Sequence, residues 1–279
     1  MKKVLLLTDF SENSINAMRY ALQLFKNEIC DFYVLNVQDS RSYTSDDLML
    51  SRGNQSLYQS LISDNKRKLK TIVGQLKLQA NERLHNFKSI VDYDVFLDSI
   101  KQIIAKYHVD LIVMGTNGAS NLKETLFGSS ALKVLRNIDC NTLVVPDEFK
   151  YKQPKKLLLA LDSDDYIDHI TVKEIFELME HLDAKIEIKR YVTSKDNINA
   201  TINSDNSILL ELIDQDKFTY DVVTGMSLSS ILINSTKPKD TDIITLVGQF
   251  KGFFERLFGT PSKTEISKHL DCPLMIFHN

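Results

Sequence analysis

The sequence predicts an α/β protein of two tandem domains, each a doubly wound parallel sheet of five strands. Short continuous apolar runs alternate with amphipathic helical stretches, and such runs are typical of strands buried on both faces. The order of these segments repeats once after a polar stretch. A chain of 279 residues has room for two domains of ordinary size. We place the first domain at 1–148 and the second at 153–279.

The first half alternates strands and helices from its start. Residues 4–8 (VLLLT) form an apolar run that stops at Asp9. A cluster of helix-capping residues at 11–14 precedes apolar residues at spacings of three and four, which predicts a helix over 13–27. The remaining predicted elements are strands at 32–37, 87–93, 110–114 and 142–146, helices at 54–81, 98–107 and 129–137, and a polar loop at 38–53.

The second half restarts this pattern after the polar stretch 147–155, which contains Pro154 and is typical of a linker. LLLALD at 157–162 echoes LLLTD at 5–9. The approach to the last strand also repeats, because an Asp-Cys pair precedes it in both halves. The shared order indicates an internal duplication of a whole domain. The predicted elements are a helix at 167–182 and strands at 157–162, 185–188 with 191–192, 221–223, 242–247 and 273–277.

Composition excludes several classes of function. The formal net charge of -3 gives no general attraction to nucleic acid or to an anionic membrane. The apolar run that follows the two N-terminal lysines is too short for a signal peptide, and no run is long enough to span a membrane, so we expect a cytoplasmic protein. Three scattered cysteines and six scattered histidines show no metal-ligand spacing, and we expect reduced, structural thiols.

The segment 114–130 (MGTNGASNLKETLFGSS) carries the main chemical signal. It leaves a buried strand and enters a helix, where glycines let the backbone approach a phosphate and the helix start offers free N–H groups. The spacing fits neither a Walker P-loop nor the Rossmann glycine fingerprint. A single glycine would indicate only a turn, and a serine only a cap, but the complete set favours nucleotide binding: Gly115, Gly118, Gly128, Ser129 and Ser130.

This motif lies in a wider pattern that resembles the universal stress protein (UspA-like) family. The opening strand ends in Thr8-Asp9-Phe10-Ser11, the second strand ends in Asn36-Val37, and the closing strand is 143–146. The resemblance covers the whole first half in order. It implies the adenine nucleotide alpha hydrolase-like fold, and in members that bind ATP the glycine pattern holds the phosphates and the ribose.

The resemblance also implies a set of residue roles. The backbones of Gly115 and Gly118 would line the ribose and phosphates, and the helix start at 128–130 would hold the phosphate tail. Met114 would pack near the base. The residues that would border the adenine and ribose are Thr8, Asp9 and Val37, and Phe10 is a further candidate nucleotide-binding residue. The Asp9 carboxylate would help to hold Mg²⁺ with the nucleotide. From the residues alone, Asp9 equally suits a turn, and Val37 and Met114 equally suit the core.

The second domain departs from this pattern. The loop that corresponds to 114–130 is two residues shorter and contains Phe250, Phe253 and Phe254. Pro261 also removes one N–H from the start of the following helix. We therefore expect a degenerate copy that does not bind ATP in the same way. Its aromatic loop would pack against the first domain or a partner, or form a remodelled site for another ligand.

No catalytic set of residues is evident, and the first hypothesis is an ATP-binding regulatory protein of the stress response, with slow or absent hydrolysis. One alternative is an ATPase or nucleotidyl transferase, for which Asp9 is the candidate base. Another is a ligand-free interaction scaffold. The expected partners are an adenine nucleotide and an unidentified protein. The last strands of the two halves are expected to pair within the chain as a pseudo-dimer, and a further homodimer is left open.

Overall fold

The computed structural model describes residues 1–38, 56–116, 127–163, 165–192, 198–225, 228, 241–248 and 272–278. In the first half, the elements are β1 (Lys2–Leu7), α1 (Glu12–Leu24), β2 (Cys30–Val37), α3 (Ser56–Gln79), β3 (His85–Asp92), α4 (Phe96–Tyr107), β4 (Leu111–Gly115), α5 (Ser129–Asn137) and β5 (Thr142–Val145). In the second half, they are β6 (Lys156–Leu161), α6 (His169–Leu182), β7 (Lys185–Val192), α7 (Ile198–Leu212), β8 (Phe218–Thr224), β9 (Ile243–Gly248) and β10 (Leu274–His278).

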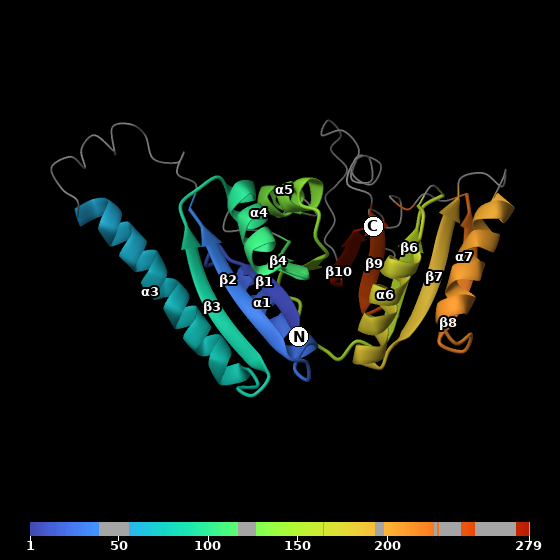
Figure 1. Cartoon of the computed structure of the whole chain (residues 1–279), viewed down its shortest axis with the longest axis horizontal. Coiled ribbons are helices and arrows are strands. Elements are labelled where there is room, and N and C mark those ends of the chain that lie inside the picture. The colour runs from blue at the N-terminus through green and yellow to red at the C-terminus, as the bar shows by residue number, and fades with distance from the viewer. Residues whose placement is uncertain are drawn as a thin grey trace.

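The strands form one ten-stranded sheet in the order β3-β2-β1-β4-β5-β10-β9-β6-β7-β8. Within each half all pairs are parallel, and the two halves meet where β5 and β10 pair antiparallel, with Leu143 opposite Met275. The second half therefore repeats the strand order of the first half in reverse. In Figure 1 the halves lie side by side, with β3 and α3 at one end and β8 and α7 at the other. The α/β class and the parallel sheets match the prediction.

The core lies on both faces of this sheet. Val4 and Leu6 of β1 are buried in one hydrophobic cluster, while Leu5 and Leu7 are buried in the other. Alternate residues of a strand point to opposite faces, so a run such as VLLL is buried on both sides, as expected for a parallel sheet covered by helices. The first cluster also contains residues of α1, α3 and α6, and the second contains residues of α4 and α5.

Local capping explains where two of the helices begin. The Ser11 side chain accepts a hydrogen bond from the Ser14 N–H at the start of α1. The Asp168 side chain accepts one from the Thr171 N–H at the start of α6. Both side chains satisfy an N–H that the first helical turn leaves without a backbone partner. Ser11 and Asp168 therefore occupy equivalent positions at the starts of α1 and α6.

The second half has a reduced second helix, as its sequence leads us to expect, although the pattern gives no bounds for it. α7 spans Ile198–Leu212 and is shorter than its counterpart α3. Its sequence INATINSDNSILLEL contains β-branched residues and short polar side chains, which weaken the helical periodicity. The expected loops at 38–53 and 249–261 lie outside the described residues, except for residue 38.

The three cysteines are reduced and buried, as the sequence predicts. Cys30, Cys140 and Cys272 are free thiols and buried. Burial raises the pKa of Cys30 and of Cys140 to about 12, so both stay protonated near neutral pH. Within the portions of the chain that the structure covers, no helix combines the length and apolar character needed to cross a bilayer.

Candidate functional site

A cavity of about 240 Å³ lies at the carboxyl ends of β1, β2 and β4, where α4 and α5 also reach it. The carboxyl edge of a parallel sheet is the usual ligand site in doubly wound folds. Residues from three separate predicted segments line this cavity. They are Thr8, Asp9, Val37, Met114, Gly115 and Ser130. The fold therefore brings together six of the ten residues proposed from the sequence.

The turn after β1 fixes the polar part of the cavity. The Thr8 hydroxyl accepts a hydrogen bond from the Phe10 N–H at 2.9 Å and lies 2.9 Å from the Ser14 hydroxyl. Phe10 has a φ of 69°, a left-handed conformation that bends the chain toward α1. Asp9 Oδ1 accepts hydrogen bonds from the N–H and the hydroxyl of Ser11 at 3.0 and 2.6 Å. Asp9 thus serves a turn and also lines the cavity.

Apolar side chains form another part of the lining. Leu35 and Val37 come from β2, Phe96 from the start of α4, and Met114 from β4. Burial of a flat apolar ring against such surfaces is favourable, because it removes apolar area from water. The cavity is below the usual size of pockets that enclose a whole drug-sized ligand. It therefore suits the base and ribose of a nucleotide, with the phosphates extending out of it.

The close packing of α1 against β4 requires a glycine at position 115. A Cβ at this position would lie 2.8 Å from Cγ and Oδ1 of Asn13 on α1. The glycine thus permits α1 to pack closely against the end of β4, which the glycine motif did not reveal. Its backbone still lines the cavity. Both requirements, the close helix and the exposed backbone, favour glycine at this position.

Hydrogen bonds hold both ends of the segment after β4 next to the sheet. The Thr116 N–H donates to the Val145 carbonyl at 3.0 Å, and the Gly128 N–H donates to the Thr116 carbonyl at 2.7 Å. Gly128 is the N-cap of α5 and provides no side-chain acceptor for the first helical turn. The start of this helix is therefore an available anion site beside the cavity. Gly118 lies outside the described residues.

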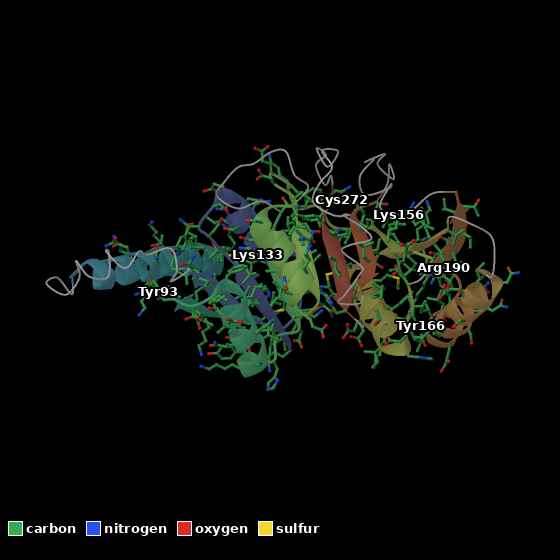
Figure 2. The ribbon with its side chains drawn as sticks, turned by 90° about the horizontal axis from the view of Figure 1, so that it is seen from above. Tyr93, Lys133, Lys156, Tyr166, Arg190 and Cys272 are labelled. Carbon is green, nitrogen blue, oxygen red and sulfur yellow. The ribbon has the colours of Figure 1, made fainter. Side chains whose placement is uncertain are left out.

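Lys133 is a cavity residue that the sequence analysis missed. It lies one turn after Ser130 on α5, and both residues line the cavity. Figure 2 shows it on the α5 ribbon of the first half. Its ammonium supplies positive charge on the same side as the helix start, which suits a phosphate. The sequence contains a feature that could have indicated Lys133, because it lies three residues after Ser130 and residues three apart on a helix share a face.

Three predicted residues are not part of the lining as far as the described residues define it. Phe10 packs against the core, and the Lys68 ammonium lies 5.8 Å from the centre of its ring. Gly128 and Ser129 lie at the start of α5, and Ser129 is exposed. Gly128 and Ser129 therefore lie beside the cavity rather than in its lining.

The residues present fit Mg²⁺ only as a companion of the nucleotide. Within the described parts of the chain, no group of three or more acidic, histidine or cysteine side chains is placed to hold a metal ion. Mg²⁺ is commonly bound by one or two carboxylates together with substrate phosphates and water. Asp9 at the cavity is the carboxylate that suits this arrangement.

Comparison with known proteins agrees with this fold. Residues 1–146 match the universal stress protein family. A universal stress protein of Methanocaldococcus jannaschii is 28% identical over 155 residues, which are 56% of this chain and 84% of that protein. A second protein of the same name from that organism is 27% identical over 154 residues, 52% of this chain and 94% of its own length.

A solved structure extends the similarity to the second half. A universal stress protein from Archaeoglobus fulgidus covers 99% of this chain and 98% of its own, with a TM-score of 0.60 and 16% identity. At that identity the likeness shows the fold, which is the tandem arrangement of two such domains. The profile match to the first half decides the family. This chain belongs to the universal stress protein family.

Proposed function

We propose that the first half binds an ATP-class nucleotide and that occupancy regulates how this cytoplasmic protein engages a protein partner. The observation that carries the proposal is the cavity at the carboxyl ends of β1, β2 and β4, where residues of the predicted motif converge beside the uncapped start of α5. Apolar side chains, hydroxyls, an available helix start and a lysine meet there, and a nucleotide needs each of these features.

In this proposal, different residues contact the base, the ribose, the phosphates and Mg²⁺. Leu35, Val37 and Met114 pack on the base, while Thr8 and the Gly115 backbone lie against the ribose. The α5 start, Ser130 and Lys133 hold the phosphates through N–H groups, a hydroxyl and a positive charge. Asp9 holds Mg²⁺ together with the phosphates, and the ion would neutralise part of their charge.

The same geometry favours regulation over catalysis. An ATPase needs a base or a water-positioning group aimed at the terminal phosphate. Asp9 is the candidate, but its Oδ1 already accepts two hydrogen bonds from Ser11 within the turn. We therefore expect slow or absent turnover. An ATP-using enzyme remains the second candidate function, and measured turnover decides between the two.

The first experiment identifies nucleotide that copurifies with the chain and measures ATP affinity by calorimetry. We expect ATP at one per chain and little conversion to ADP. Lys133→Met should weaken ATP binding by roughly three- to tenfold, because a charge near phosphate is lost, while adenosine binding stays unchanged. Arg136→Met on the same helix is the matched control, since Arg136 does not line the cavity.

Two results would change the proposal. Absence of any ATP binding by the natural chain would overturn it in favour of a ligand-free scaffold. Rapid conversion of bound ATP would instead support the enzyme. Equal losses in Lys133→Met and Arg136→Met would show that general surface charge, not this cavity, attracts the nucleotide.

A further inference from the structure

A second and larger cavity, of about 460 Å³, lies between the two halves. It opens at the amino ends of β1, β4 and β5, on the edge of the sheet opposite to the candidate nucleotide site. α6 and the last residues of β10 provide its other wall. Its charged lining is dominated by carboxylates, since it contains Asp110, Asp139, Glu174 and Glu177 but only one ammonium among the described lining residues, that of Lys2.

His278 adds a buried polar group to this lining. Its side chain is 4% exposed, and neither ring nitrogen has a hydrogen-bond partner among the residues described. Nδ1 lies 3.6 Å from Asp139 Oδ1, which is too long for a hydrogen bond. Burial lowers the pKa of His278, an effect that the Asp139 charge opposes, so the ring is neutral near pH 7 and offers one nitrogen as an acceptor.

The internal duplication provides an occupied counterpart of this cavity. Asp110 and Lys3 exchange two hydrogen bonds, in which the Lys3 N–H donates to the carboxylate at 2.7 Å and the Asp110 N–H donates to the Lys3 carbonyl. Asp242 and Lys156 repeat both bonds in the second half. Asp242 is therefore the equivalent of Asp110. Counted from the helix caps, Tyr20 of α1 is the equivalent of Glu177 of α6.

The linker between the halves fills the counterpart. Tyr20 contacts the rings of Phe149 and Tyr151 at centroid distances of 6.0 and 5.3 Å. The Lys152 ammonium lies 2.5 Å from Asp242 Oδ1. In the second half, the place beside Asp242 is thus occupied by the linker, whose aromatic rings pack on Tyr20 and whose Lys152 ammonium pairs with the carboxylate. At the equivalent place in the other half, the described residues leave the cavity of about 460 Å³.

We propose that the open cavity binds a linear organic cation with two or more ammonium groups, a di- or polyamine. The carboxylates and the His278 nitrogen are all acceptors, and an ammonium group has three donors to give them. Phe25, Leu178 and Phe277 in the same lining suit the methylene chain between the charges. A small metal ion fits less well, because in the described portion of the chain no three such ligands come together around one point.

The test uses the full chain without nucleotide, with spermidine, 1,4-diaminobutane and butylamine as probes in calorimetry. We expect one spermidine per chain, bound at least about tenfold more tightly than butylamine, because a single ammonium uses one part of the acceptor set. The double variant Asp139→Asn/Glu177→Gln should weaken spermidine binding by roughly tenfold. Both side chains are exposed, and the contact of Asp139 with His278, at 3.6 Å, is too long for a hydrogen bond, so the variant should fold.

A matched variant separates a built site from general negative charge. Glu211→Gln/Asp214→Asn removes the same charge from exposed positions at the end of α7, away from the cavity. It should leave spermidine affinity within about twofold of the natural chain. His278→Phe fills the same space without a ring acceptor and should weaken binding by about threefold or more.

The proposal fails if butylamine and spermidine bind equally, or if the two double variants lose the same affinity. It also fails if several spermidine molecules bind each chain with no dependence on Asp139, Glu177 or His278. Thermal melting of each variant checks that the fold is intact, and a variant that melts early is replaced by the single substitution Glu177→Gln.

Discussion

The two halves use the carboxyl ends of their first two strands in different ways. In the first half, Asn36 of β2 donates to the Thr8 carbonyl at 2.8 Å, and the candidate cavity opens beside them. The strand registers place Arg190 of β7 at the position equivalent to Asn36. Arg190 donates from Nη1 to the carbonyls of Asp162 and Asp165 at 2.6 and 3.0 Å.

The charge of the Arg190 guanidinium is paired within the second half, where Nη2 lies 2.7 Å from Asp205 Oδ2. Its Nε donates to Asp205 of α7 at 2.7 Å, and the Tyr220 hydroxyl donates to the same carboxylate at 2.5 Å. Burial and the Asp205 carboxylate raise the pKa of Tyr220, so its hydroxyl remains a donor. Figure 2 shows Arg190 within the second half, far from Lys133 of the first.

The two halves therefore differ in the side chain at the end of the second strand. A short amide at the end of β2 leaves room beside the turn, whereas a long guanidinium at the end of β7 cross-links the turn after β6 to α7 and β8. A buried ion pair of this kind contributes a specific local structure more than net stability. The half with this cross-link is also the half whose sequence departs from the glycine motif.

The largest expected effect comes from removing this cross-link. Arg190→Met should lower the free energy of unfolding of the second half by about 3–5 kcal/mol, because Asp205, which is 3% exposed, would be left as a buried unpaired charge. Urea unfolding followed by circular dichroism measures the change. Lys189→Met on the same strand is the control, and its partly exposed ion pair with Glu187 should cost less than about 1 kcal/mol. Equal costs would refute the role given to Arg190.

A pair of glycine substitutions sharpens the view of the first half. Gly115→Ala should destabilise the chain by about 1–3 kcal/mol, because its Cβ would overlap the buried Asn13 side chain. Gly74→Ala in α3 has no atom within 4 Å of its Cβ and should stabilise by about 0.5–1 kcal/mol through helix propensity. Thermal or urea unfolding of both variants gives the comparison. A neutral Gly115→Ala would mean that α1 does not depend on this glycine.

The smallest expected effect concerns the contact between the halves. His181 of α6 lies 2.9 Å from Glu28 and 3.0 Å from the Leu24 carbonyl of the first half. The hydrogen bond with Glu28 raises the pKa of His181 above 6.5, and the hydrogen bond with His181 lowers the pKa of Glu28 below 4.5. The pair is therefore fully formed between about pH 4.5 and 6.5 and is lost as the pH rises through the raised value of His181.

Removal of the Glu28 charge tests this contact. Glu28→Gln should cost on the order of 1 kcal/mol at pH 6 and much less at pH 9, where His181 is neutral in either chain. Urea unfolding at both values of pH measures the difference. A cost that does not change with pH would contradict an ionic contact and indicate packing alone.

Much of the fold was predictable from the sequence for a local reason. Buried parallel strands need continuous apolar residues, so VLLLT at 4–8 predicts β1, and Asp110 marks the start of β4 within one residue. The bounds of the reduced helix α7 could not be predicted, because its contacts with α6 and its Asp205 ion pair, rather than its own periodicity, stabilise it. Local pattern could not provide those distant partners.

The candidate site divides in the same way. The sequence alone determined the duplicated α/β order, the strand that leads to the glycine segment, and six of the residues that line the cavity. Only the tertiary structure decided that Gly115 accommodates Asn13, that Lys133 faces the cavity and that Arg190 takes the place of Asn36. It also decided that the linker packs beside Asp242, whereas the described residues leave a cavity beside Asp110. The physical reason is that apolar periodicity is written along the chain, whereas these contacts join residues that only the closed sheet brings together.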